Sequence, residues 1–394
     1  MDKGSETNAF GAWSLPEEYQ QLRDTTRKFM KNEVWPVEDT LEHDAISCPP
    51  EKLKPLQEKA KQLGLWCART PAEYGGAGLN LLGQCVFAEE AKKCRMGAYI
   101  PGMGAFGADP PNVIWEGTQA QIEKYGLPGV GAGKRIFVAI SEPSGGADPA
   151  RAIKTHAVLK GDRYILNGSK MWITGAENAD WGIVYARTGH GGRGGITSFI
   201  VDGNAKGLST KVIPVIRAYA PYEVFFDNVE VPVENRLGPE GGGFKLAEKW
   251  LVEGRLPYAA GVIGIAQASL DLAIDWAKQR ETFGSRLSDK QAIQWMLADS
   301  EIELRAARLL VYEAAWKGDL GQDFKIEASI AKVTATETAG RVVDRCIQIF
   351  GGLGVSKALP LERWYRELRI KRIGEGPSEV QRMVVARHLL GNRG

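Results

Sequence analysis

The sequence predicts an α+β protein with an N-terminal α-helical domain, a middle β-barrel or β-sandwich domain and a C-terminal four-helix bundle. Apolar residues recur at helical spacing toward both ends of the chain, whereas short runs of β-branched and aromatic residues occupy its middle. The chain has 394 residues, which is enough for two or three domains that each bury a core. We expect the domains to span residues 1–133, 134–243 and 244–394.

The N-terminal part is expected to be helical throughout. Leu22, Phe29 and Val34 are spaced to share one helical face, and a second apolar series at helical spacing covers residues 53–63. Clusters of Pro, Gly and Asn separate these series and mark the ends of the helices.

The middle part is expected to be a β-domain of roughly 100 residues, because strand signals recur every 8 to 12 residues. Gly161-Asp162 and Asn167-Gly168 are turn sequences that separate the apolar runs. The expected strands cover residues 136–140, 163–166, 171–174, 181–186, 197–201, 211–216 and 222–226.

Long helical patterns return after the glycine cluster at residues 238–243 and continue to the end of the chain, as a helix bundle requires. Their apolar series cover residues 263–277, 293–309 and 326–350. Ser378 followed by Gln381 predicts a capping box at the start of the last helix, and Gly391 predicts its end.

Composition excludes several classes of protein. Lys and Arg (50) nearly balance Asp and Glu (48), so the net charge of +2 indicates neither a nucleic-acid partner nor an anionic membrane. Five cysteines without a C-x-x-C pair, together with four histidines, indicate neither a disulfide framework nor a metal site. Without a signal peptide or a long uncharged apolar run, we expect no membrane insertion and a cytoplasmic protein, or a mitochondrial matrix protein if a transit peptide has been removed.

Two glycine-rich segments resemble nucleotide-binding motifs but lack their context. Residues 102–107 match G-x-G-x-x-G, yet Pro101 and Pro110-Pro111 leave neither the strand nor the helix that a dinucleotide site needs. Residues 129–135 resemble a phosphate loop, but Pro128 replaces its first glycine. We interpret the second segment as a flexible joint into the β-domain.

Two segments of the expected β-domain carry candidate binding groups. Residues 141–150, rich in small side chains, follow a strand directly, so their amides and the Ser141 hydroxyl are available to a ring or a phosphate. Trp172 and Thr174 end another strand, where they are suited to cover and hydrogen-bond a flat cofactor. The alternatives are a plain β-turn and a core tryptophan.

Three segments of the expected bundle are further candidates. Residues 280–284 end one helix and Gln291 begins the next, while residues 348–354 form a helix end and a permissive loop. Glu375 stands between two glycines just before the last helix, and a carboxylate in an apolar cleft is a suitable base for a proton α to a carbonyl. Its alternative is an exposed loop glutamate.

These five segments, in this order on an α/β/α chain, resemble the acyl-CoA dehydrogenase family over nearly the whole length, most weakly before residue 60. The resemblance implies an FAD-dependent oxidoreductase that converts an acyl-CoA thioester to its trans-2-enoyl form, in fatty acid or aromatic acid catabolism. It also implies a homotetramer, or dimer of dimers, and an electron-transferring flavoprotein as the electron acceptor.

The resemblance assigns roles to individual residues. Glu375 matches the catalytic base. The residues that match substrate contacts are Arg255, Gly376 and Ala147. Part of the FAD site is expected to come from a neighbouring subunit. The residues that match FAD contacts are Ile140, Ser141, Gly146, Ala147, Trp172, Ile173, Thr174, Arg280, Thr282, Phe283, Gln291, Gln348, Gly351, Gly352, Pro377 and Glu379. The acyl pocket is expected to include residues 99–106 and 250–258.

The chain departs from the family pattern at four positions. Gly374 stands where the family often has Tyr and Pro377 where it has Thr, while Ala147 and Glu379 replace a common Ser and Gln. The expected consequences are a larger space beside the base and a non-standard acyl group that is branched, cyclic, aromatic or polar. Some members carry the base at the position of Gly254, which has no carboxylate here, so we assign the base to Glu375.

Two other functions compete with this interpretation. An acyl-CoA oxidase or flavin monooxygenase would use the same fold and admit oxygen to the flavin, and oxygen consumption distinguishes it. A non-catalytic acyl-CoA-binding or flavin-binding protein is the alternative from another class, and failure to bind FAD would favour it.

Overall fold

The computed structural model describes residues 15–189 and 191–391, which pack as two compact units. The helical unit contains the described residues up to 66, residues 79–106 and residues from 254 onward. The sheet unit contains residues 67–78 and 107–253. This division by packing places residues 107–133 with the sheet, and the three expected domain boundaries remain predictions.

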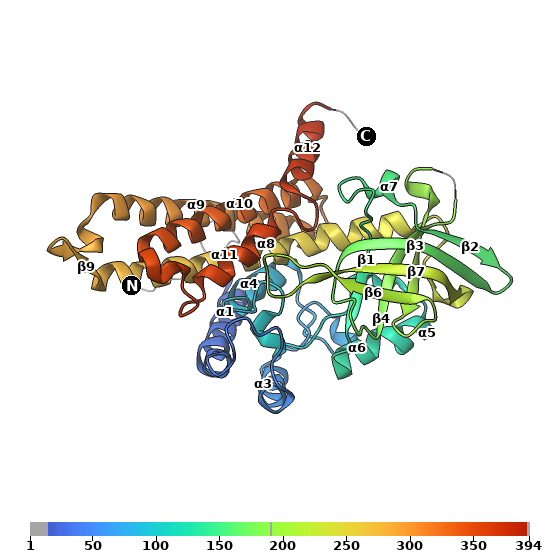
Figure 1. Ribbon diagram of the computed structural model, residues 1–394, viewed down its shortest axis with the longest axis horizontal. Coiled ribbons are helices and arrows are strands. Elements are labelled where there is room, and N and C mark those ends of the chain that lie inside the picture. Colours follow the sequence, from blue (N-terminus) through green and yellow to red (C-terminus); the bar gives the residue numbers. More distant parts are fainter. Residues whose placement is uncertain (1–14, 190, 392–394) are drawn as a thin grey trace, which may run out of the picture. The chain divides into compact units, whose positions relative to one another are not determined.

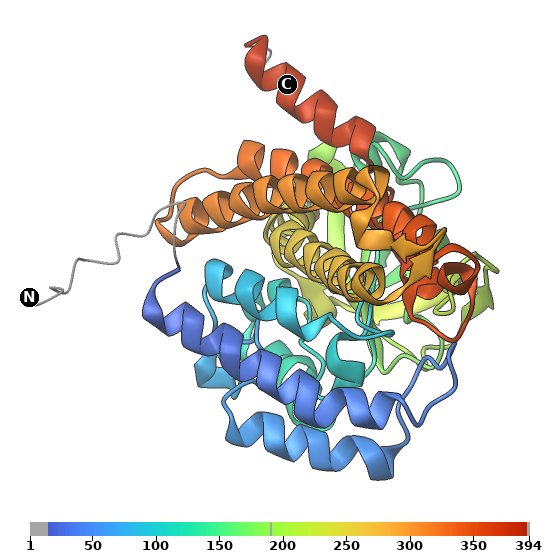
Figure 2. The same ribbon diagram turned by 90° about the vertical axis from the view of Figure 1, so that its left-hand side faces the viewer.

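Long helices form most of the helical unit, and α8, α9 and α10 lie lengthwise side by side (Figures 1 and 2). Helix α10 buries small residues at Ala328, Ala331, Ala335 and Ala339, whose spacing of three to four places them on one face and lets a neighbouring helix approach closely. The helices of this part are α8 (Gly243–Gln279), whose residues from 254 onward belong to this unit, α9 (Gln291–Asp319), α10 (Lys325–Phe350), α11 (Leu361–Lys371) and α12 (Ser378–Leu389).

The N-terminal helices pack on this bundle through α4, which lies between α1 and α9 in Figure 2. The carboxylate of Asp319, at the end of α9, accepts hydrogen bonds from the first two backbone N–H groups of α4. Arg308 and Tyr312 on α9 bind the buried carboxylate of Glu89 on α4. The N-terminal helices are α1 (Glu17–Phe29), the π-helical turn Met30–Val34, α2 (Trp35–Glu38), α3 (Pro50–Gln62) and α4 (Leu81–Ala91).

The sheet unit is built on an eight-stranded, mainly antiparallel sheet with the order β6-β7-β3-β2-β4-β5-β8, in which β1 pairs with β4 in parallel. Its strands are β1 (Ile136–Ala139), β2 (His156–Lys160), β3 (Arg163–Thr174), β4 (Trp181–Arg187), β5 (Ile196–Asp202), β6 (Leu208–Val212), β7 (Pro221–Pro232) and β8 (Arg236–Leu237). Short helices α5 (Gln119–Gln121), α6 (Leu127–Ala132) and α7 (Pro149–Ala152) also belong to this unit.

Strand β4 is buried on both faces, which explains its continuous apolar sequence. Trp181, Ile183 and Tyr185 pack into one cluster with Val113 and Ile114. The alternate residues of β4 pack into a second cluster, with apolar residues of β3, β5 and β7. Residues of β1, β2, β3, β4, β5 and β7 therefore share one core.

Several local expectations were wrong. Asn167-Gly168 is not a turn between strands, since β3 continues through it, and the register shift at Leu166/Gly168 marks a bulge there. The expected strand at 211–216 ends at Val212, and part of the expected joint at 129–135 is the end of α6. Helix α12 has no capping box, because Pro377 is its N-cap and the Gln381 side chain turns toward the preceding loop.

Helix α8 is the one described helix long and apolar enough to cross a membrane by length and composition. Of its most apolar 18-residue window, 67% is buried inside the structure. That burial is typical of a core helix.

Candidate active site

A buried ion pair between Lys170 and Glu142 holds the loop that follows β1. Lys170 on β3 is completely buried, and its Nζ donates to the carboxylate of Glu142 (2.9 Å) and to the carbonyl of Ile140 (3.1 Å). Glu142 also accepts hydrogen bonds from the backbone N–H groups of Lys154 and Thr155. These bonds hold Ser141 at the top of β1, and Gly146 and Ala147 follow it on an exposed loop.

The pKa values of this pair follow from burial and contact. Burial alone would raise the pKa of the Glu142 carboxyl, but the Lys170 ammonium and the donated hydrogen bonds hold it below its ordinary value. Burial lowers the pKa of Lys170 to about 8, against the pull of Glu142. At neutral pH both groups are therefore charged, so each depends on the other for compensation.

Trp172 lies beside this loop because the backbone N–H of Met171 donates to the carbonyl of Ser141 (2.9 Å). The register of β3 against β7 shifts between Lys170 and Ile173, and Trp172 adopts a left-handed backbone with φ of 65°. This shift leaves the indole 53% exposed while Ile173 is buried, so the alternative of a core tryptophan is wrong. A strained backbone that holds a large aromatic ring in solvent is characteristic of a binding site.

Thr174, two residues further on, is already hydrogen-bonded on one side. The guanidinium of Arg217 is buried, and its Nη2 donates to Thr174 Oγ1 (2.9 Å). Since that bond uses a lone pair of the hydroxyl, the hydroxyl proton remains available to donate to an acceptor on a ligand.

The bundle candidates Arg280 to Phe283 and Gln348 to Gly352 come together at one end of the helical unit (Figure 1). The Trp276 ring links them, because it stacks on Phe350 (ring centroids 5.2 Å apart) and lies 5.9 Å from the Arg280 guanidinium. Thr282 lies in the short hairpin β9 (Glu281–Thr282) and β10 (Ser285–Arg286), and Gln291 is the first residue of α9.

Phe283 is the tip of this hairpin and is fully exposed, with φ of 50°. A phenylalanine in the left-handed region with its whole ring in solvent is a second strained, exposed aromatic among the candidate residues. Arg255 and Gln279 are 24 residues apart on α8, about 36 Å at 1.5 Å per residue. The hairpin therefore cannot serve the same reacting centre as Arg255 within one chain.

One carboxylate oxygen of Glu375 makes no hydrogen bond to the described residues. Glu375 has φ of 54° in the loop between α11 and α12, and its Oε2 is buried without a hydrogen-bond partner among the described residues. A buried carboxylate oxygen that no protein donor satisfies is available to accept a proton from a ligand.

Buried polar side chains hold the backbone of this loop instead. Arg255 Nε donates to the carbonyl of Glu375 (3.4 Å), and Gln381 Nε2 donates to the carbonyl of Gly376 (3.2 Å). Lys332 Nζ on α10 donates to the same Gly376 carbonyl (2.8 Å). The structure thus brings together three of the four residues assigned to proton removal and substrate, Glu375, Gly376 and Arg255, while Ala147 belongs to the sheet unit. Pro377, the N-cap of α12, follows them directly, and Glu379 is exposed in the first turn.

Position 254 on α8 lies close to the Glu375 carboxylate. A Cβ built on Gly254 would be 3.7 Å from Glu375 Oε2, so a carboxylate at either position could reach the same place. Glu253, its neighbour, is bonded elsewhere, since Asn112 Nδ2 donates to its carboxylate (2.6 Å).

The space left by Gly374 is not open, which corrects the expectation of a larger space beside the base. A Cβ at that position would lie 2.9 Å from the hydroxyl oxygen of Tyr258. Tyr258 and Tyr99 also flank the ammonium of Lys371, at 4.3 and 3.7 Å from their ring centroids. Tyr258 therefore fills the place that a larger residue at 374 would need.

Sequence reasoning missed most residues that support these groups. Lys170, Arg217, Lys332 and Trp276 are scattered singly along the chain, and no motif marks them. The one available signal was a lysine inside an otherwise apolar strand or helix face, as at Lys170 and Lys332, because a buried lysine requires partners.

The residues present fit FAD. The sheet unit offers an exposed aromatic face at Trp172, a hydroxyl donor at Thr174 and the small, exposed loop after Ser141, which suit a flat, hydrogen-bonding ring system. The helical unit offers an unpartnered carboxylate at Glu375. Each unit therefore carries groups suited to a flavin-dependent enzyme.

Comparison with known proteins gives the family. The acyl-CoA dehydrogenase N-terminal, middle and C-terminal domain families match residues 16–134, 138–229 and 241–390. The 3-(aryl)acrylate reductase of Clostridium sporogenes is 39% identical over 95% of this chain and 99% of its own. The caffeyl-CoA reductase-Etf complex subunit CarC of Acetobacterium woodii is 36% identical over 95% and 98%.

Solved structures agree. Butyryl-CoA dehydrogenase from Megasphaera elsdenii superposes with a TM-score of 0.84 at 35% identity, over 96% of this chain and 99% of that one. The chain belongs to the acyl-CoA dehydrogenase family and is an oxidoreductase of that family, for which FAD is the implied cofactor.

Proposed function

We propose that the protein is an FAD-dependent acyl-CoA dehydrogenase in which Glu375 removes the α proton of an acyl-CoA thioester. The observation that carries the proposal is the buried, unpartnered Oε2 of Glu375 on a strained loop. The side chains of Arg255, Lys332 and Gln381 donate to backbone carbonyls of that loop, so these bonds leave Oε2 for the substrate.

The Glu375 carboxylate takes the proton from C2, and the electron pair of that C–H bond forms the double bond to C3 as a hydride leaves C3. A bound FAD, held by Ser141, Trp172 and Thr174, would supply the hydride acceptor. In this proposal the Glu375 backbone N–H donates to the thioester carbonyl, where negative charge develops.

Other candidate residues orient the groups. Ile140, Ser141, Trp172 and Thr174 would hold the flavin ring, and the Arg280 and Gln348 segments would serve the FAD of a neighbouring subunit. This sharing is supported by the distance of about 36 Å along α8 between Arg255 and the hairpin.

An aryl-substituted acyl group is the substrate class we favour. The name of one relative, 3-(aryl)acrylate reductase, refers to aryl acrylates, and another is a caffeyl-CoA reductase subunit. Two tyrosines, Tyr99 and Tyr258, lie around Lys371 next to the base loop, and aromatic side chains pack well on an aryl ring. Short, straight chains are the competing class, because relatives of similar identity are short-chain specific.

Anaerobic titration of the purified flavoprotein tests both points. We expect 3-arylpropionyl-CoA to bleach the oxidised flavin band at lower concentration than butyryl-CoA, and arylacryloyl-CoA to reoxidise the reduced enzyme. Preferential bleaching by butyryl-CoA would contradict the aryl assignment but keep the dehydrogenase, whereas no bleaching by any acyl-CoA would contradict both. Rapid oxygen consumption during aerobic turnover would indicate an oxidase.

An electron-transferring flavoprotein is the proposed electron partner. A relative is named as a subunit of an Etf complex, which supports this choice. We also propose a cytoplasmic location, because the five cysteines are free and buried, as is usual in a reducing compartment.

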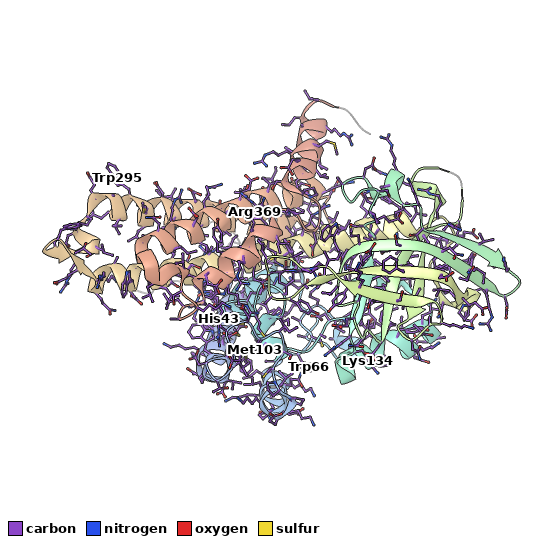
Figure 3. The ribbon with its side chains drawn as sticks, in the orientation of Figure 1. His43, Trp66, Met103, Lys134, Trp295 and Arg369 are labelled. Atoms are coloured by element: carbon purple, nitrogen blue, oxygen red, sulfur yellow. The ribbon has the colours of Figure 1, made fainter. Side chains whose placement is uncertain are left out.

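A homotetramer is the proposed assembly, and an apolar stripe on α9 supports it. Trp295, Ile302, Leu309 and Trp316 recur every seven residues and are exposed by 37 to 65%. Figure 3 shows the Trp295 side chain on the outer side of α9. Apolar residues with this spacing form one continuous seam along a helix, which is typical of helix-to-helix contacts between subunits.

We therefore expect Trp295→Glu combined with Ile302→Glu to dissociate the assembly, because it would bury two charges in that seam. Sedimentation velocity measures the change, with Glu301→Gln on the same helix as the control. A double variant with the wild-type sedimentation coefficient would place the interface elsewhere.

A further inference from the structure

Lys332 is a buried cation that the proposed mechanism does not use. It lies in the middle of α10, its side chain has no exposed surface, and its Nζ donates to the carbonyls of Gly376 (2.8 Å) and Arg372 (3.3 Å). These carbonyls lie on either side of Glu375 in the chain. One ammonium therefore connects the two ends of the loop that carries the proposed base.

The loop needs such support because its backbone is strained. Glu375 has φ of 54° and Gly376 has φ of 91°, and the left-handed region is unfavourable for a glutamate. A strained conformation persists only when its surroundings over-determine it. Lys332, Gln381 and Arg255 supply the hydrogen bonds that do so.

Lys332 does not form a conventional ion pair with the carboxylate it supports. Its described hydrogen bonds go to backbone carbonyls, and Oε2 of Glu375 has no partner among the described residues. An ammonium that bonded directly to the base would compete with the substrate proton. Bonding to the backbone instead fixes the position of the carboxylate without occupying it.

We infer that Lys332 is a positioning residue, which holds the Glu375 loop in its strained conformation and aims the carboxylate at the α proton of the substrate. This inference rests on the proposed role of Glu375. Gln381 is the second donor to the same carbonyl, so Lys332 acts from the bundle side and Gln381 from α12.

The charges around Lys332 set its titration. Glu375, Glu337 and Glu379 raise its pKa, whereas burial, the largest effect, and Arg255 lower it, and the result is about 8. An unfolded lysine keeps its proton up to about pH 10.5. Between pH 8 and 10.5 the unfolded chain therefore binds more protons at this position, so Lys332 contributes a rise in stability with pH across that window.

The test uses the holoenzyme and compares Lys332→Met with Lys332→Arg. The matched control is Thr336→Val, which removes a buried hydrogen bond one turn further along α10, from Thr336 Oγ1 to the carbonyl of Lys332 (2.8 Å). Three quantities are measured for each variant: FAD content from the visible spectrum, the thermal unfolding midpoint between pH 7 and 10.5, and the rate of deuterium exchange at C2 of an acyl-CoA in D2O.

We expect K332M to retain FAD but to exchange the α proton on the order of 100-fold more slowly, as a displacement of about 1 Å at a reacting group causes. Lys332→Arg, which keeps the charge and donors, should recover part of the rate, and Thr336→Val should exchange at the wild-type rate. The rise in unfolding midpoint between pH 8 and 10.5 should be smaller in K332M than in the wild type.

The inference would be overturned if K332M exchanged the α proton at the wild-type rate and differed only in a lower unfolding midpoint. Lys332 would then have a structural role alone. If K332M does not fold, Lys332→Gln takes its place, and a wild-type exchange rate in that variant has the same meaning. Exchange that survives Glu375→Gln would contradict the proposed function itself, so the two failures are distinguishable.

Discussion

Replacement of Glu375 by Gln should abolish most of the reduction of the flavin by substrate while FAD remains bound. Gln has nearly the shape of Glu, so the loop and the hydrogen bonds from Arg255, Lys332 and Gln381 to its backbone carbonyls persist, but an amide cannot accept the α proton. General bases contribute factors of about 10² to 10⁴, and we expect a loss toward the upper end because Glu375 is the one candidate base on this loop. Stopped-flow absorbance of the flavin band under anaerobic conditions measures the rate.

Glu253→Gln is the matched control for this variant. It removes a carboxylate next to Gly254 in the chain, and that carboxylate already accepts a hydrogen bond from Asn112. It should reduce at the wild-type rate. A normal rate in Glu375→Gln, or a large loss in Glu253→Gln, would move the base away from residue 375.

The geometry at position 254 allows a stricter form of the same experiment. A Cβ there would lie 3.7 Å from Glu375 Oε2, so a glutamate introduced at 254 can direct its carboxylate to the same region. The double variant E375G/G254E should therefore recover part of the activity that E375Q loses, and Gly suits the backbone of residue 375, where φ is 54°.

Replacement of Lys170 by Met should destabilise the chain by about 3–5 kcal/mol, because it leaves the Glu142 carboxylate buried without its counter-ion. The Ile140 carbonyl loses a donor in the same variant, so the loop that carries Ser141 should loosen and FAD affinity should fall. Chemical denaturation followed by circular dichroism measures the free energy of unfolding.

Lys160→Met is the control, since Lys160 is exposed at the end of β2 and its loss should change stability by no more than about 0.5 kcal/mol. The double variant K170M/E142Q should be more stable than K170M alone, because it removes the uncompensated charge. Equal stability of K170M and K160M would contradict the role of the pair.

The sequence was sufficient for the architecture and for most element positions near the site. The end of β3 at Thr174, the beginning of α9 at Gln291 and the end of α10 at Phe350 follow from local periodicity and from glycine and proline placement. These are short-range properties, which a single sequence reveals well.

The sequence could not predict how the site residues are presented. The exposure of Trp172 depends on a register shift between β3 and β7, which is a property of two strands far apart in the chain. Gln381 was assigned to a capping box because its spacing from Ser378 fits that pattern. Its side-chain amide instead donates to the carbonyls of Glu375 and Gly376.

The packing beside Glu375 also could not be predicted from the local sequence. Gly374 alone predicts an enlarged space, but the Tyr258 hydroxyl from α8 occupies it. The glycine on one element and the tyrosine on another compensate in volume, so the space stays filled. Analysis of a single sequence detects only the glycine.

The central claim is that Glu375 removes a proton from C2 of an acyl-CoA, and deuterium exchange tests it most directly. The holoenzyme is incubated in D2O without oxygen with the acyl-CoA that bleaches its flavin best, and the recovered thioester is examined by NMR. The account predicts deuterium at C2 with the wild-type enzyme and with Glu253→Gln, and none above the uncatalysed rate with Glu375→Gln. Exchange at C2 by the Glu375→Gln variant at the wild-type rate would contradict it.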